Sequence, residues 1–157
     1  KKSIEYVAVK SVERGRRKKF MDEVAIFTAI VNDHIKSLPQ GGAGLVSSEA
    51  QQANVLSNWH PNIIRFHNWY ETRNHFWIIY EYCVGGTLQA LMKADERLPE
   101  DTVKKFAYEV LEGLSYLHSQ GIIYGDLRPQ NIMVNEYQRL KLCDFGASCK
   151  VADLSGY

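Results

Sequence analysis

The sequence has no long apolar run and no strong excess of charge of either sign. No stretch approaches the roughly 20 apolar residues that a membrane-spanning helix needs. Its 19 basic and 18 acidic residues give a formal net charge of +1, which offers no basic surface to attract nucleic acid or a membrane. We therefore predict a water-soluble chain with neither nucleic-acid nor membrane partners.

Cysteine is scarce as well. Cys83, Cys143 and Cys149 are odd in number and form no C-x-x-C pair. A reduced intracellular protein is the simplest explanation. The opening residues show no signal-peptide pattern, so we expect a cytoplasmic location. The 157 residues contain no internal repeat and fit one domain at most.

Apolar periodicity predicts a first half that is rich in strands. Three runs of β-branched and aromatic residues are expected strands, at 5–12, 63–70 and 75–82. After a charged connection at 13–19, one apolar stripe with helical spacing predicts a helix, and it consists of Phe20, Val24, Phe27, Ile30 and Val31. Residues 32–58 interrupt the pattern with a loop rich in glycine and serine, and with a short helix at 49–57.

The second half is predicted to be mainly helical. Thr87 can cap a short helix at 88–94. Pro99 opens the longest helix, whose apolar stripe runs from Val103 to Leu117 and which ends at Gly121. A short strand at 122–124 and a small hairpin of 132–134 with 140–143 follow. A sheet-rich part followed by a helical part indicates an α+β fold.

Five polar residues stand out by their order and spacing. Each is weak evidence alone, because a motif such as Asp-Phe-Gly at 144–146 occurs by chance in many proteins. Lys10 lies in a predicted strand and Glu23 in a predicted helix. Asp126 lies in a loop with Asn131 five residues later, and Asp144 directly follows a predicted strand.

In this order the motifs resemble those of the eukaryotic protein kinases. His-Pro-Asn at 60–62 and Gly-Gly-Thr-Leu at 85–88 belong to the same set, and the resemblance covers the chain except residues 32–58. The runs HNWYETRNHFWIIYEYCVGGTL and IIYGDLRPQNIMV are similar to the Fused and Unc-51-like group of serine/threonine kinases. The resemblance implies a two-lobe kinase-like fold, truncated at both ends, with 1–82 in the small lobe and 83–157 in the large lobe.

The resemblance also implies ATP and Mg²⁺ as cofactors, and roles for the polar residues. Phosphoryl transfer needs positioning and charge neutralisation more than covalent help. Lys10 would reach the α- and β-phosphates, and Asn131 and Asp144 would supply oxygen ligands to Mg²⁺. Asp126 would accept or orient the proton of the substrate hydroxyl. Arg128 stands where the family usually has lysine and would keep positive charge near the γ-phosphate.

The adenine pocket is expected around the end of the run 75–82. Ala8 shares a strand face with Lys10 and would cover the adenine, while Met133 would form the pocket floor. The hinge would be Glu81-Tyr82-Cys83, with backbone groups facing the adenine edge. Tyr80 would be the gatekeeper residue and would narrow the back of the pocket.

Glu23 is the expected partner of Lys10, because its run EVAIFTAI carries the apolar spacing of the helix. The insertion leaves a rival open. The predicted helix at 49–57 could instead present Glu49 or Gln51 to the lysine.

The sequence departs from the family at Tyr124-Gly125-Asp126, where His-Arg-Asp is usual. By matching positions, Tyr124 would complete an aromatic column with three phenylalanines, namely Phe27, Phe66 and Phe145. The missing arginine normally binds a phosphorylated activation loop. We therefore expect phosphorylation of the activation loop to have little or no regulatory effect, either because the site is always ordered or because it is little used for catalysis.

Two functions follow from the resemblance. The first is a serine/threonine protein kinase. Proline at position 129 is more typical of that class than of the tyrosine kinases. These 157 residues alone are expected to be inactive, because no glycine-rich loop precedes Lys10. The alternative is an ATP-binding pseudokinase scaffold for microtubule- or cilium-associated proteins, which implies a location on the cytoskeleton or in a cilium.

Overall fold

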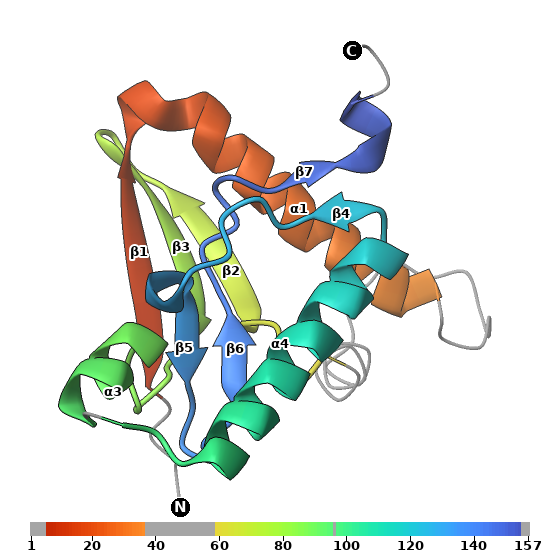
Figure 1. Ribbon diagram of the computed structural model, residues 1–157. Coiled ribbons are helices and arrows are strands. Elements are labelled where there is room, and N and C mark those ends of the chain that lie inside the picture. Colours follow the sequence, from red (N-terminus) through yellow and green to blue (C-terminus); the bar gives the residue numbers. More distant parts are fainter. Residues whose placement is uncertain (1–5, 37–58, 96, 155–157) are drawn as a thin grey trace, which may run out of the picture.

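The computed structural model describes residues 6–36, 59–95 and 97–154, with only the backbone of 32–36 (Figure 1). The predicted α+β class is confirmed. In its described residues, the first part contains a sheet and one long helix, namely β1 (Val7–Glu13), α1 (Arg17–Lys36), β2 (Phe66–Glu71) and β3 (His75–Glu81). The second part contains two helices and four short strands, namely α3 (Leu88–Ala94), α4 (Glu100–Ser119), β4 (Ile122–Ile123), β5 (Ile132–Val134), β6 (Leu140–Leu142) and β7 (Cys149–Lys150).

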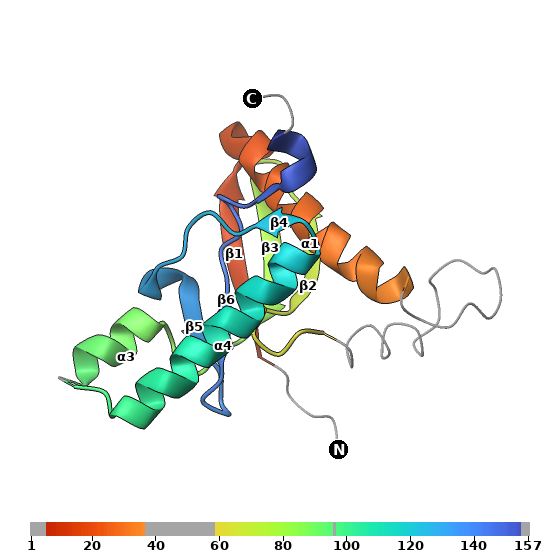
Figure 2. The ribbon, with the colours of Figure 1, turned by 45° about the vertical axis from the view of Figure 1, so that its right-hand side comes forward.

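The sheet of the first part is antiparallel, with the strand order β1-β3-β2. Alternate residues of the central strand β3 are buried, because successive side chains point to opposite faces. Helix α1 crosses one face of this sheet (Figure 2). There the ring of Phe20 stacks on that of Phe76, with centroids 4.4 Å apart. This packing fixes α1 against the strand that precedes the predicted hinge.

The second part is built around α4 and the β5–β6 hairpin. Helix α4 lies so close to β6 that a Cβ added at Gly113 would be 3.0 Å from a methyl carbon of Leu142. Its predicted apolar stripe is only partly covered, since Val103 and Leu111 are 50% and 64% exposed. None of the helices in the described ranges is long and apolar enough to cross a membrane.

Two predicted elements begin at other residues in the structure. Helix α1 begins at Arg17, inside the expected charged connection 13–19, after a 3-10 turn at Arg14–Arg16. The strand expected at 63–70 begins only at Phe66, because Ile63 and Ile64 pair with Leu142 of β6 instead. That pairing ties the two parts of the fold together. The helix expected at 49–57 lies outside the described residues.

Strand β7 was not predicted. It pairs antiparallel with β4, joining Ile123 to Cys149 and Ile122 to Lys150. The pairing holds the segment after Asp144 beside the segment that leads to Asp126. Both of these acidic residues therefore sit on short connections whose ends are fixed.

Candidate active site

Lys10 lies at the centre of the candidate site and contacts two carboxylates from distant parts of the chain. Its ammonium is 2.9 and 2.8 Å from the two carboxylate oxygens of Glu23 on α1. It is also 2.7 Å from Oδ1 of Asp144, which follows β6. The expected Lys10–Glu23 contact is thus present, whereas the rivals Glu49 and Gln51 lie outside the described residues.

The charges of these three groups support one another. Burial alone would lower the pKa of Lys10, but Glu23 and Asp144 outweigh it, and the pKa is raised. Burial alone would raise the pKa of Asp144, but the Lys10 ammonium outweighs it, and the pKa is lowered. Lys10 therefore stays cationic and Asp144 anionic at neutral pH. Glu23 is 2% exposed, and a buried carboxylate needs hydrogen-bonding partners of this kind.

Asp126 is held by two neighbours in the loop between β4 and β5. The side-chain amide of Asn131 donates to the Asp126 carbonyl at 3.1 Å and to its Oδ2 at 2.8 Å. The Arg128 guanidinium lies 3.1 Å from the same Oδ2. A 3-10 turn at Pro129–Asn131 brings these residues together. Two predicted catalytic residues, Asp126 and Arg128, therefore form one cluster with the predicted metal ligand Asn131.

The predicted metal ligands fit a cation that is shared with phosphate. Asn131 uses its amide nitrogen on Asp126, which leaves Oδ1 as the amide atom for a cation. Its carbonyl accepts from the Cys143 amide at 2.9 Å, next to Asp144. Across the described ranges, no group of three or more His, Cys, Asp or Glu residues could hold a metal. Mg²⁺ commonly takes one or two carboxylates and completes its shell with phosphate oxygens and water.

The predicted adenine pocket lies where β3 ends. Ala8 pairs with Tyr80 across the sheet, and Met133 bridges to Thr87 just after the hinge. The Gly85 amide donates to the Val134 carbonyl, and the Val134 amide donates to Gly86, at 2.9 and 2.8 Å. The hinge is therefore tied to β5, the strand that carries Met133.

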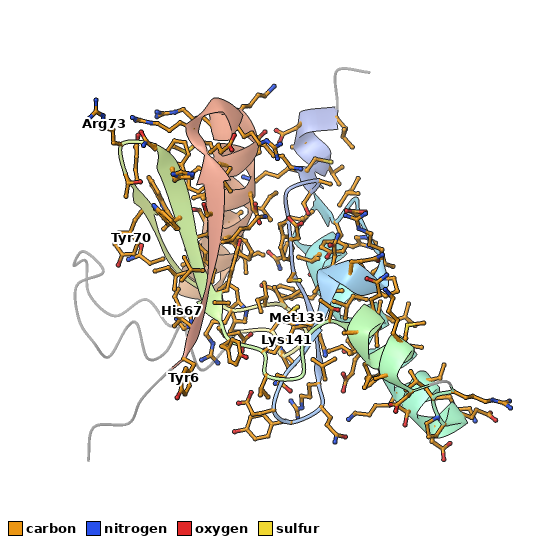
Figure 3. The ribbon with its side chains drawn as sticks, turned by 90° about the vertical axis from the view of Figure 1, so that its left-hand side faces the viewer. Tyr6, His67, Tyr70, Arg73, Met133 and Lys141 are labelled. Atoms are coloured by element: carbon orange, nitrogen blue, oxygen red, sulfur yellow. The ribbon has the colours of Figure 1, made fainter. Side chains whose placement is uncertain are left out.

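The side chains of two hinge residues, Glu81 and Cys83, interact with other parts of the protein. The Glu81 carboxylate accepts from the Arg65 amide at 2.7 Å and pairs with the Lys141 ammonium at 2.8 Å. Figure 3 labels Lys141 beside Met133, its partner in the β5–β6 register. Burial raises the pKa of the Cys83 thiol to about 12, so this cysteine is uncharged and packs as an apolar group in the core.

A cavity of about 410 Å³ opens beside Lys10, Glu23 and Asp144. Arg16 and Lys19 also line it. This size lies within the range of small-ligand pockets. Its lining carries three cations and, with Glu13, three carboxylates, so these charged groups balance.

The aromatic column predicted from four matching positions is present. The ring of Phe27 lies 5.1 Å from that of Phe66 and 4.8 Å from that of Phe145, centroid to centroid. Tyr124 continues the column with its ring 5.3 Å from Phe145. Its hydroxyl donates to the Asn131 carbonyl at 3.0 Å and also contacts the Cys143 carbonyl. Tyrosine therefore supplies both a ring for stacking and a tie between the two loops of the site.

Gly125 adopts a conformation that disfavours the arginine usual in the family. Its φ is +84°, in the left-handed region, and an added Cβ would overlap the carbonyl of Ala147. A side chain here would need both a strained backbone and a shift of the segment after Gly146. The structure thus gives a physical reason for glycine at this position.

We expect Gly125→Ala to lower the free energy of unfolding by about 2–4 kcal/mol, combining left-handed strain and overpacking. Urea unfolding measures this. Gly121→Ala separates the two causes, because Gly121 has φ +65° but open space around it, and should lose only about 1–2 kcal/mol. Gly15→Ala, also in open space, should change stability by less than about 0.5 kcal/mol. Equal losses at positions 125 and 121 would contradict the overlap with Ala147.

Sequence reasoning missed two side-chain contacts in and beside the candidate site. One is the hydroxyl of Tyr80, which donates to Oε1 of Glu23 at 2.9 Å. The other is Lys141, whose side chain is only 7% exposed and pairs with Glu81. The only sequence signal for the Lys141 contact was a lysine between two leucines in a short strand, and this signal does not identify its partner.

The fold and these contacts define a protein kinase domain. Residues 1–156 match the family model of the protein kinase domain, and the chain belongs to this family. It is similar to the serine/threonine-protein kinase RUNKEL of Arabidopsis thaliana, with 41% identity over 155 residues, which cover 99% of this chain and 9% of that protein.

Two other relatives match a shorter stretch. The serine/threonine-protein kinase ULK4 of Mus musculus is 41% identical over 98 residues, covering 57% of this chain and 8% of that protein. Cell division control protein 7 of Schizosaccharomyces pombe is 38% identical over 98 residues, covering 62% and 9%. The chain thus spans less than a tenth of each of these relatives. The match to ULK4 agrees with the resemblance to the Unc-51-like group.

Proposed function

We propose that the protein containing this chain transfers the γ-phosphate of ATP to a serine or threonine hydroxyl of another protein. The observation that carries the proposal is Lys10 paired at once with Glu23 and Asp144. A lysine held in this way can meet a polyphosphate at a fixed position. We assign residues 1–82 to the small lobe of this kinase domain and 83–157 to its large lobe.

The side chains would divide the work between the nucleotide and the acceptor. Lys10 would exchange part of its contact with Asp144 for phosphate oxygens, while Glu23 keeps it in place. Asn131 and Asp144 would hold Mg²⁺, which when bound neutralises charge on the phosphate oxygens. Asp126 would take the hydrogen bond of the acceptor hydroxyl, and Arg128, exposed beside it, would stabilise charge that develops on the transferred group.

The adenine would bind between Ala8 and Met133. We assign its edge to backbone groups of Glu81 and Cys83, because the Glu81 side chain is already engaged by Arg65 and Lys141. Tyr80, 8% exposed, would close the back of this pocket. The polar recognition of the base would thus come from the backbone and its shape from side chains.

A second candidate function is favoured by Gly125. Without an arginine at position 125, directly before Asp126, the usual phosphate-dependent switch has no anchor, and a nucleotide-binding scaffold would not need one. In that case the domain would bind ATP and recruit proteins of microtubule- or cilium-associated assemblies. The kinase proposal would place the protein in the cytoplasm, and the scaffold proposal on the cytoskeleton or in a cilium.

The full-length protein can decide between the two candidates. Binding of a fluorescent ATP analogue is measured first, with Mg²⁺ and then with excess EDTA. Transfer of labelled γ-phosphate to a generic protein acceptor is measured next, followed by identification of the labelled residue type. Mg²⁺-dependent label on serine or threonine supports the kinase. Nucleotide binding without transfer supports the scaffold, and label on tyrosine would overturn the assigned acceptor class.

A further inference from the structure

Tyr80 also contacts Glu23, the buried partner of Lys10. Its hydroxyl donates to Oε1 of Glu23 at 2.9 Å, while both oxygens of Glu23 accept from Lys10. The carboxylate on α1 is therefore held by β1 through the lysine and by β3 through the tyrosine. A buried carboxylate with one fewer donor is held less firmly, because hydrogen bonds to charged groups are among the stronger ones.

The position of this hydroxyl is fixed by packing. The Tyr80 ring lies 5.5 Å from that of Phe27 and 6.4 Å from that of Phe66, both members of the aromatic column. Tyr80 also pairs with Ala8 in the sheet register. Burial, and then the Glu23 carboxylate, raise the pKa of the Tyr80 hydroxyl, so it remains a donor at every physiological pH. The group is thus permanently available to Glu23.

The same site has no arginine at position 125 that could bind an activation-loop phosphate and so order the site. Position 125 carries no side chain, and its backbone leaves no room for one. Lys10 meanwhile has a competing partner in Asp144 at 2.7 Å, so its position depends on how firmly Glu23 is held. We propose that Tyr80 is a positioning residue whose hydroxyl fixes Glu23, and through it Lys10, so that the site is ordered without a phosphate at Gly125. This inference rests on the proposed nucleotide-binding function.

The test uses Tyr80→Phe in the full-length protein, which keeps the ring in the column and removes only the hydroxyl. The Kd for Mg²⁺-bound mant-ATP should rise about tenfold, the lower end of what a hydrogen bond to a charged group contributes. Tyr108→Phe is the matched control, because Tyr108 is an exposed tyrosine on α4, and it should bind like the wild type. Unchanged binding by Tyr80→Phe would overturn the proposal.

A double-mutant cycle shows whether Tyr80 acts through Glu23. In a Glu23→Ala background, Tyr80→Phe should change the Kd by less than about twofold, because coupled residues are not additive. Effects that simply multiply would assign Tyr80 a separate role and overturn the proposal. A purely structural role would not produce this coupling.

Hydrogen exchange without nucleotide separates this inference from the proposed function. Amides of residues 21–27 on α1 should exchange about tenfold faster in Tyr80→Phe, while those of 104–114 on α4 should not change. If the α1 amides exchanged at the same rate in Tyr80→Phe and in the wild type, the positioning role would be overturned even if ATP binds. If the wild type binds no mant-ATP, the proposed function fails, and faster exchange confined to α1 would still support the Tyr80 contact.

Discussion

Asp126→Asn should reduce γ-phosphate transfer by the full-length protein about 10²–10⁴-fold, the usual contribution of a general base. Asparagine has nearly the same shape and its oxygen can still accept from Asn131 and Arg128, which contact Oδ2 of Asp126. The loop should therefore keep its geometry and lose only the basic carboxylate. Initial rates of label transfer at saturating Mg²⁺ and ATP measure the effect.

Nucleotide binding is the internal control for this variant. Asp126 makes no part of the Lys10–Glu23–Asp144 cluster, so the Kd for mant-ATP should stay within about twofold of the wild type. Asp101→Asn, an exposed carboxylate in the first turn of α4, should leave both binding and transfer unchanged. Full transfer by Asp126→Asn would remove Asp126 from the mechanism.

Tyr124→Ala should lower the free energy of unfolding by about 3–5 kcal/mol, as for other large aromatic residues deleted from a core. Tyr124 is 2% exposed and stacks on Phe145. Its removal would leave a cavity at one end of the column. It would also remove one of the donors to the Asn131 carbonyl and the hydroxyl that contacts the Cys143 carbonyl. Because Asp144 directly precedes Phe145, weaker binding of Mg²⁺–ATP should accompany the loss. Urea unfolding and mant-ATP titration measure the two effects.

Tyr124→Phe separates stacking from hydrogen bonding. It keeps the ring and should lose only about 0.5–1.5 kcal/mol, the net contribution of a typical hydrogen bond. If Tyr124→Ala changed neither stability nor nucleotide affinity, the column would have no energetic role. A loss in Tyr124→Phe as large as that in Tyr124→Ala would attribute the effect to the hydroxyl.

Much of the fold follows from local signals in the sequence. The short helix was predicted at 88–94 and is observed at Leu88–Ala94, with the Thr87 side chain accepting from the Ala90 amide as its cap. Helix capping depends on residues within one turn, so the sequence contains the necessary information. The hairpin of 132–134 with 140–143 was predicted on the same local basis.

Other features depend on contacts between distant residues. The run from Ile63 looks like the start of a strand, but Ile63 and Ile64 pair with β6 instead. Strand β7 has two residues, and only the presence of β4 beside it defines it as a strand. The basic run before Phe20 carries no apolar periodicity, so the start of α1 at Arg17 left no signal.

The contacts of the candidate site also include some that the sequence predicted and some that it did not. The spacing of Lys10 and Glu23 on a strand and a helix was enough to predict their contact, because a family pattern relates the two positions. The Tyr80 hydroxyl and the Lys141 ammonium were not predicted to find carboxylates. Sequence gives the type of a side chain, whereas its partner depends on register and packing across three strands.

The ion pair of Glu81 and Lys141, whose side chains are 19% and 7% exposed, has a consequence for how this protein can vary. Removing one member would leave an uncompensated buried charge, which typically costs about 3–5 kcal/mol, whereas replacing both by apolar residues of similar volume is often neutral. Single changes at either position should therefore be rare and paired changes tolerated. Among related chains, positions 81 and 141 are expected to covary, although 60 residues separate them in the sequence.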